Sequence, residues 1–145
     1  MNDDRRIDLA ALLLRTGLGA MFIAHALLKV LVFTPAGTVQ FFESLGLPGF
    51  LAYATIVAEL GGGAMLVLGV YTRTVAFALI PVLIGATWAH SGNGWLFTSP
   101  KGGWEYPAFL TLAAVVAGLL GDGRYSLKAT LVPQQGVAPR LQRAA

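Results

Sequence analysis

The sequence predicts an all-α polytopic membrane protein, an up-down bundle of four transmembrane helices. The first observation is composition: 56% of the 145 residues are hydrophobic and 12% are charged, against roughly 25% charged in a soluble domain. The second is that the apolar residues form long blocks instead of a 3.6-residue alternation, which indicates lipid as the solvent. The third is that the connections between the blocks are short, which favours antiparallel neighbours.

Four blocks are long enough to be transmembrane helices, which need roughly 17–25 residues to cross about 30 Å of hydrocarbon. They are residues 9–33, 51–70, 74–90 and 106–121. The last two are at the short end of that range and would cross with little tilt. We therefore expect one four-helix membrane domain over residues 1–128. Residues 129–145 are polar and are expected to form a flexible cytoplasmic tail.

A cleaved signal peptide is the alternative interpretation of the first block. Residues 24–26 (AHA) match a small-x-small cleavage site. Residues 2–8, however, carry three aspartates against two arginines, and the apolar run continues past the site to Phe33. A positively charged start and a short apolar run are typical of signal peptides, so a transmembrane helix is favoured.

The basic residues predict the orientation of the bundle. In a four-span arrangement seven of them fall on one side of the membrane: Arg5, Arg6, Arg73, Arg124, Lys128, Arg140 and Arg143. The loops on the other side, residues 34–50 and 91–105, hold only Lys101. The positive-inside rule places the first side, with both chain ends, in the cytoplasm. The net charge of +3 is thus a topology signal, and no nucleic-acid partner is expected because aromatic and basic residues are not interleaved.

The two outer loops have different patterns. Residues 34–50 contain a short helical pattern that Thr38 can cap, and we expect it to lie in the membrane interface. Residues 91–105 are rich in turn formers and tryptophan. The aromatic residues there form either a belt at the outer interface or a lid over a site between the helices.

Ionisable side chains inside the spans are informative, because each is costly in lipid unless it is paired or hydrated. The first span contains Arg15, His25 and Lys29, which share one face with Phe22 at about 100° per residue. The second span contains Glu59 as its only charge, followed by three glycines that allow close helix approach.

Several of these groups are predicted to lie in the same half of the membrane, judged by their depth below its outer surface. At a rise of about 1.5 Å per residue, His25 and Glu59 both lie about 12 Å below the outer surface, and Lys29 lies about 6 Å below it. His90 ends the third span on the same side, and Glu105 begins the fourth. These five groups are therefore predicted to converge on the outer half of the bundle.

Structural and functional interpretations of these residues compete. In the structural one, Lys29 pairs with Glu59, while Arg15 reaches toward Glu59 or extends inward to lipid phosphate. His90 and Glu105 are then ordinary interface residues. In the functional one, His25, Lys29 and Glu59 exchange protons, and their matching depth on adjacent helices favours this interpretation for the set.

Short motifs along the chain resemble, in order and spacing, those of the DoxX family of small bacterial membrane proteins. They are LRTGLG (14–19), His25 with Lys29, FESLGLP (42–48), AELGGG (58–63), GVYTR (69–73), His90 with Asn93 and Gly94, GWEYP (103–107) and GDGRYS (121–126). The resemblance covers about residues 9–128. It implies a four-helix protein of the bacterial inner membrane. It also implies a link to quinone chemistry, since family members look like subunits of thiosulfate:quinone oxidoreductase, partners in oxidative-stress complexes or quinone and catechol resistance proteins.

The leading functional hypothesis is a quinone-linked redox subunit or accessory that binds a lipophilic ligand in the outer half of the bundle. His25, Lys29 and Glu59 would contact the ring oxygens and exchange protons as catalytic residues. Further ligand-binding candidates line the same region or its approaches: Arg15, Phe22, Trp88, His90, Trp104, Glu105 and Tyr106. The tryptophans and Tyr106 would form the apolar walls.

Electron transfer would need a partner redox protein. The chain has no haem-attachment or dinucleotide-binding motif, and with two histidines and no cysteine it predicts neither a metal site nor a sulfur-carrier role. The alternative is a non-catalytic membrane anchor or assembly factor, whose glycine-rich face would dock other subunits or a second copy. A small transporter is less favoured because the four spans show no inverted repeats.

Overall fold

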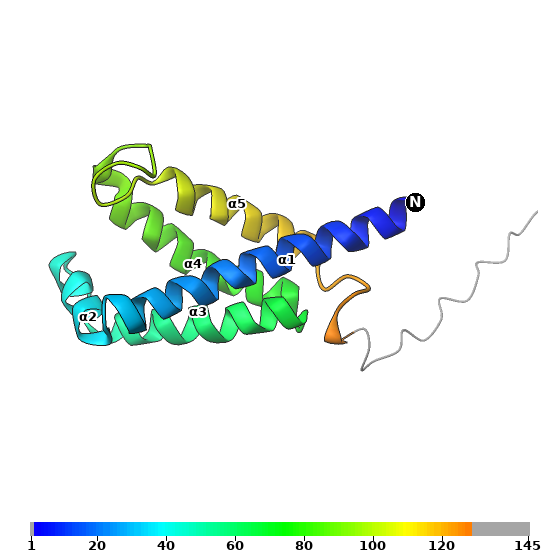
Figure 1. Ribbon diagram of the computed structural model, residues 1–145, viewed down its shortest axis with the longest axis horizontal. Coiled ribbons are helices and arrows are strands. Elements are labelled where there is room, and N and C mark those ends of the chain that lie inside the picture. Colours follow the sequence, from blue (N-terminus) through cyan, green and yellow to red (C-terminus); the bar gives the residue numbers. More distant parts are fainter. Residues whose placement is uncertain (1, 129–145) are drawn as a thin grey trace, which may run out of the picture.

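The computed structural model describes residues 2–128 and shows a bundle of helices (Figure 1). The elements in order are α1 (Asp3–Leu27), the π-helix η1 (Leu28–Val32), α2 (Pro35–Ser44), α3 (Phe50–Leu68), α4 (Thr72–His90), the 3-10 turn η2 (Ser91–Asn93) and α5 (Glu105–Leu120). No strand occurs in this part of the chain. The predicted tail over residues 129–145 lies outside the described residues.

The helix lengths fit a membrane. Three helical segments are long and apolar enough to cross it: Asp3–Val32, Phe50–Leu68 and Thr72–Asn93. The fourth, α5, is apolar and has 16 residues, which corresponds to about 24 Å. The four predicted spans correspond to α1 with η1, α3, α4 and α5. The prediction of an all-α membrane bundle is confirmed.

The bundle consists of two helix pairs. α1 packs mainly on α3, and α4 packs mainly on α5, while α3–α4 and α1–α5 contacts join the pairs. One end of the bundle carries α2 and residues 91–104, and we call it the loop end. The other carries the start of α1 and residues 121–128, and we call it the terminal end. Figure 1 shows the loop end on the left and the N-terminus on the right.

A glycine contact sets the close approach of α1 and α3. A Cβ atom on Gly19 would lie 2.6 Å from the carbonyl oxygen of Gly63, and one on Gly63 would lie 2.8 Å from that of Gly19. The backbones of the two helices therefore touch at this point, as small residues allow in membrane bundles. Gly61, in contrast, faces open space. Part of the glycine-rich face, at Gly63, therefore packs against α1 of the same chain.

The short helix α2 forms, but with a different cap from the predicted one. Thr34 accepts a hydrogen bond from the backbone N–H of Gly37 at 3.2 Å, and Pro35 occupies the first turn. Proline suits that position because its missing N–H would have no helical partner there. Thr38 is buried instead, and its hydroxyl donates to the carbonyls of Thr34 and Lys29 at 2.9 and 3.2 Å. It attaches α2 to the end of the first span.

Candidate functional site

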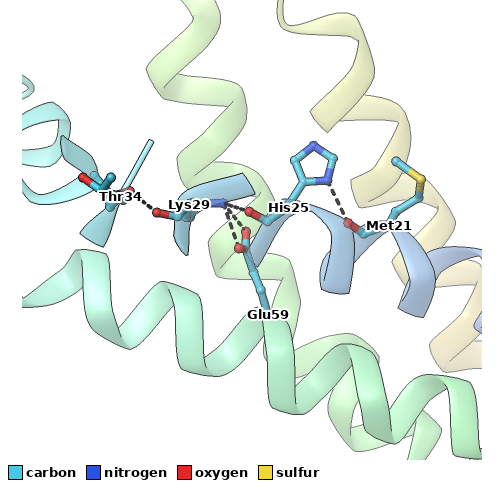
Figure 2. A network of polar contacts seen from close by, with 6 residues as sticks. Met21, His25, Lys29, Thr34 and Glu59 are labelled. Carbon is cyan, nitrogen blue, oxygen red and sulfur yellow. Dashed lines mark hydrogen bonds and ion pairs between the residues drawn. The ribbon is translucent and has the colours of Figure 1, made fainter. Parts of the chain in front are cut away.

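A buried ion pair between Lys29 and Glu59 lies in the loop-end half of the bundle (Figure 2). The Lys29 Nζ donates to both carboxylate oxygens of Glu59, at 2.7 and 2.9 Å. The Glu59 side chain is only 7% exposed and that of Lys29 is 18% exposed. Such a pair is stable only if each charge keeps its partner, because a buried charge without one is strongly destabilising.

The π-helix positions Lys29. The backbone N–H of Phe33 donates to the carbonyl of Leu28 at 2.9 Å, five residues earlier, which widens the helix at this turn. Widening leaves carbonyls without their ordinary partners, and Thr38 supplies one for the carbonyl of Lys29. Isolated π-turns within long helices are frequent at functional sites. Here the turn carries Lys29, whose ammonium group binds Glu59.

His25 makes a different set of contacts from Lys29. Its Nδ1 lies 2.8 Å from the Met21 carbonyl oxygen, and since a carbonyl only accepts, Nδ1 carries the hydrogen. In the neutral ring, Nε2 is then an acceptor, and no described residue donates to it. The ring stacks on Tyr106 of α5, with centroids 5.9 Å apart. Figure 2 shows the His25 ring and the Glu59 carboxylate on different sides of α1.

Tyr106 is the second uncommitted group at this place. Its hydroxyl oxygen is buried and has no hydrogen-bond partner among residues 2–128. A buried hydroxyl without a partner is costly, so it marks a position where a water or ligand oxygen would be stabilised. Phe22, one turn before His25, belongs to the apolar core between the four spans.

The predicted tryptophan walls lie elsewhere. A groove of about 520 Å³ runs between the loop-end halves of α4 and α5, and its lining residues are Ile84, Thr87, Trp88, Ser91, Trp104, Ala108 and Thr111. Trp88 also lines a second groove of about 570 Å³, together with Leu47, Pro81, Ile84 and Gly85. His25, Lys29 and Glu59 line neither groove.

His90 and Glu105 lie at the two ends of the loop between α4 and α5. The Nδ1 of His90 bonds to the carbonyl of Ala86, in its own helix, at 2.8 Å. A Glu105 carboxylate oxygen accepts from the backbone N–H of Phe97, in the loop, at 2.8 Å. Of the five predicted ionisable groups the structure therefore pairs Lys29 with Glu59, places the His25 ring one turn away on another side of α1, and leaves His90 and Glu105 outside this pair. Within the described part of the chain, no three potential metal ligands gather at one place.

Arg15 lies at the terminal end, and both predictions for it were wrong. It is 2% exposed, so it does not extend into lipid, and it does not contact Glu59. Its Nη1 donates to the carbonyls of Leu66 and Val67 at 2.9 and 2.5 Å, and its Nη2 donates to the carbonyl of Tyr125. These carbonyls belong to the last turn of α3 and to the segment after α5, so Arg15 fastens three parts of the chain together.

Comparison with known proteins identifies the family. Residues 10–92 match the sequence profile of DoxX. The chain belongs to the DoxX family. It is 32% identical over 129 residues to "Inner membrane protein YqjF" of Escherichia coli, covering 83% of this chain and 90% of that protein. It is 40% identical over 83 residues to "Putative oxidoreductase CatD" of Bacillus subtilis, covering 57% of this chain and 60% of CatD. No solved structure shows significant similarity.

The family match confirms the predicted resemblance and locates this DoxX protein. Its apolar helices and its likeness to an inner membrane protein place it in the bacterial inner membrane, in contact with the lipid bilayer. The matched region includes His25, Lys29 and Glu59 but ends before Tyr106.

Some residues of this DoxX protein have roles in the structure that the sequence did not predict. Thr38 was predicted to be a helix cap. Its buried contact with the carbonyl of Lys29 depends on the π-turn, which the sequence does not predict. Thr87 and Ser91 were not singled out, although two hydroxyl residues four positions apart in an apolar helix are visible in the sequence and predict a polar stripe on one face.

Proposed function

We propose that this DoxX protein is a membrane-embedded subunit or accessory of a quinone-linked redox system, with a quinone-type ligand bound beside His25 and Tyr106. One observation carries the proposal. The hydroxyl of Tyr106 is buried without a hydrogen-bond partner among residues 2–128, and the Nε2 of the half-buried His25 has no donor among them. They offer one acceptor and one donor. A quinone accepts hydrogen bonds and its reduced form donates them, so this combination suits a ligand that alternates between the two.

The Lys29–Glu59 pair supports proton exchange at His25. The Nζ of Lys29 lies 3.5 Å from the backbone carbonyl oxygen of His25 while it binds Glu59, so the ion pair lies one helical turn from His25. In our proposal the imidazole takes up or releases the proton of a ring oxygen, and the Glu59 carboxylate stabilises the imidazolium that forms. The three residues act as the proton-handling group, and Tyr106 orients the ligand.

Electrons come from outside this chain in the proposed reaction. Reduction of a quinone takes two electrons and two protons. The electrons would be supplied by a partner redox protein that carries a flavin, haem or metal, and the protons would pass through the His25 site. The word oxidoreductase in the name of CatD agrees with a redox role, which we extend to this chain as part of the proposal.

Binding of a short-chain quinone to the purified protein in lipid nanodiscs tests the site. We expect Tyr106→Phe and His25→Phe each to weaken binding about tenfold, which corresponds to about 1.4 kcal/mol. Glu59→Gln should also weaken it. The matched control is Tyr53→Phe, since Tyr53 is exposed on α3. Equal affinities in wild type and all site variants would disprove the assigned roles.

A non-catalytic anchor or assembly factor is the second candidate, and one observation favours it. Both oxygens of Glu59 are bound by Lys29, so the ion pair is complete without any ligand. In that case the protein would co-purify with a stoichiometric partner or a second copy, and the site variants would change assembly without changing quinone affinity.

We also propose that both chain ends are cytoplasmic. The proposal follows from the basic residues at the terminal end and can be tested by cysteine labelling, because the chain has no cysteine. A membrane-impermeant maleimide should label Thr98→Cys, at the loop end, in intact spheroplasts. It should label Arg124→Cys only after the membrane is opened. The reverse pattern would refute this orientation.

A further inference from the structure

We propose that the groove between α4 and α5 is a second ligand site, which binds the hydroxyl-bearing form of an aromatic ligand, a hydroquinone. The ligand class rests on the proposed function, but the site does not, because none of the groove residues contributes to the His25 site. The two sites lie on different sides of α5. At about 100° per residue, Ala108 and Thr111 lie about 160° and 140° around the helix from Tyr106.

The groove has the shape and lining of a site for a flat apolar molecule. The rings of Trp88 and Trp104 line it from α4 and from the start of α5. Ile84 and Ala108 make parts of its lining purely apolar. The groove has a volume of about 520 Å³ and is shallow and open at the surface of the bundle, with Ile84 and Trp88 more than half exposed. An aromatic ring stacked on an indole is favourable beyond simple area burial.

Hydrogen-bond polarity decides which ligand the groove accepts. Its three hydroxyl side chains all donate to carbonyls of their own helices. Thr87 donates to Leu83 at 2.8 Å, Ser91 to Trp88 at 2.7 Å and Thr111 to Pro107 at 2.9 Å. Each hydroxyl has one hydrogen, and that hydrogen is already donated to a carbonyl. Toward a ligand in the groove the hydroxyl oxygen can therefore only accept a hydrogen bond. A ligand that donates hydrogen bonds is therefore selected by these three groups.

The spacing of the hydroxyls suits a ring with two hydroxyl groups. Thr87 lies in the last turn of α4 and Ser91 begins η2, about one helical turn or roughly 6 Å further along the chain, and Thr111 lines the groove from α5. A hydroquinone carries its two hydroxyl groups at opposite ends of the ring, so one can reach Thr87 while the other reaches Ser91, and Thr111 is a further acceptor on the α5 side. The indole N–H groups of both tryptophans make no hydrogen bond with any residue from 2 to 128, and they can donate to an oxygen of either redox form.

The two sites thus differ in the balance of donors and acceptors. The His25 site offers one donor, from Tyr106, and one acceptor, the Nε2 of His25. The groove offers three hydroxyl acceptors that a hydroquinone hydroxyl can use and a quinone carbonyl cannot, while its indole N–H groups serve both redox forms and do not discriminate between them. The groove therefore serves as the place where the reduced ligand is held next to the lipid.

A matched set of ligands tests this inference: a short-chain hydroquinone, its dimethyl ether and the corresponding quinone, each titrated into the protein in phosphatidylcholine nanodiscs. Two of the three tryptophans in the chain line the groove, so binding there is measured as a change in tryptophan fluorescence. We expect the hydroquinone to bind about tenfold more tightly than the ether. The Thr87→Val/Thr111→Val variant should lose this preference, and Thr87→Ser/Thr111→Ser should keep it.

The matched control is Thr16→Val, because Thr16 also donates to the carbonyl four residues earlier but lies outside the groove. It should leave the preference unchanged. Equal binding of hydroquinone and ether, or a preference that persists in the double valine variant, would overturn the inference. A preference that is lost in His25→Phe and kept in the valine variant would also overturn it, while leaving the proposed function in place.

Discussion

The first span buries two cations, one in each half of the bundle, and they are stabilised in different ways. Arg15 at the terminal end is surrounded by neutral backbone carbonyls from α3 and the segment after α5. Lys29 at the loop end is bound to a charged carboxylate. The partners of Arg15 belong to the backbone and no mutation removes them, whereas the partner of Lys29 is a single side chain.

The two ends of the bundle therefore differ in how their charged and polar groups are used. At the terminal end the charged and polar groups fasten helix ends to one another, and the helices meet at Gly19 and Gly63. At the loop end the ion pair is bordered by unsatisfied groups on His25 and Tyr106, and grooves border α4. The terminal end therefore holds the bundle together, although the Nε of Arg15 and the hydroxyl of Thr72 are also buried there without a hydrogen-bond partner among residues 2–128. In our proposal, the groups that bind a ligand lie at the loop end.

The largest expected effect comes from breaking the ion pair. Lys29→Met leaves the Glu59 carboxylate buried without a cation, and we expect it to lower the free energy of unfolding by about 3–5 kcal/mol. The measurement is a denaturant titration of the protein in mixed micelles, followed by circular dichroism.

The double variant Lys29→Met/Glu59→Leu is the control for this prediction. Replacing both charges with apolar side chains of similar size should restore stability to within about 1 kcal/mol of wild type. If the double variant is as unstable as the single one, the pair does not act through charge compensation.

Arg15→Met should have the next largest effect, a loss of roughly 2–3 kcal/mol, because three buried carbonyls lose their charged donor. The same titration measures it, with Arg6→Met as control, since Arg6 forms only an exposed ion pair with Asp3. No second substitution should rescue Arg15→Met by removing its partner, unlike the case of Lys29. A loss as small as that of Arg6→Met would show that Arg15 does not fasten the terminal end.

Gly63→Ala tests the close packing of α1 and α3. Its Cβ would lie 2.8 Å from the Gly19 carbonyl oxygen, and we expect the resulting overpacking to cost about 2 kcal/mol. The matched control is Gly61→Ala on the same helix, which meets nothing within 4 Å and should be neutral or slightly stabilising. Equal unfolding free energies for the two variants would contradict the contact.

The smallest expected effect is a pH dependence from Asp122 at the terminal end. Asp122 accepts from the backbone N–H of Thr72 at 2.7 Å and from Lys128 at 3.2 Å, and so caps α4 from outside. Burial raises the pKa of this carboxyl, but the hydrogen bonds from Thr72 and Lys128 outweigh it, so the folded pKa lies below its usual range.

The lowered pKa fixes the direction of the pH effect. Asp122 contributes stability above its unfolded-state pKa of about 4, and this contribution is lost as the pH falls through the lower folded-state pKa. We expect Asp122→Asn to cost about 0.5 kcal/mol at pH 7, because the amide oxygen can still accept from Thr72 but the ion pair with Lys128 is lost, and to cost less at about pH 3. Unfolding titrations at both pH values measure this, and a difference that grows toward acid would refute it.

The sequence predicts some features of this fold reliably because their signals are strong. Apolar blocks mark the spans, since lipid selects them by length and hydropathy. Their depths in the outer half of neighbouring helices predicted that Lys29 and Glu59 could pair, and they do. Both features depend on position along a helix, which is fixed by a constant rise per residue.

Other features depend on rotation and packing between helices, which periodicity does not determine. His25 and Lys29 were expected on one face, yet the His25 ring contacts α5 and the Lys29 ammonium group contacts α3, at the point where α1 continues into η1. Trp88 and Trp104 were expected to enclose the ionisable groups but line a groove on the α4–α5 pair. The partners of Arg15 are backbone carbonyls, which no side-chain pattern reveals.

The ion pair also has a consequence for the biosynthesis of the protein. The first span leaves the ribosome with Arg15 and Lys29 still without partners. Translocon-mediated insertion of an Arg or Lys costs roughly 2.5–3.5 kcal/mol at the centre of a helix and less nearer its ends, where these two residues lie. The partner Glu59 follows Lys29 by 30 residues, which at about 5–20 residues per second takes about 2–6 s. During that interval α1 is a poor independent membrane segment. We therefore expect it to remain beside the insertion machinery until α3 emerges, so that the first and third helices enter the bilayer as a pair.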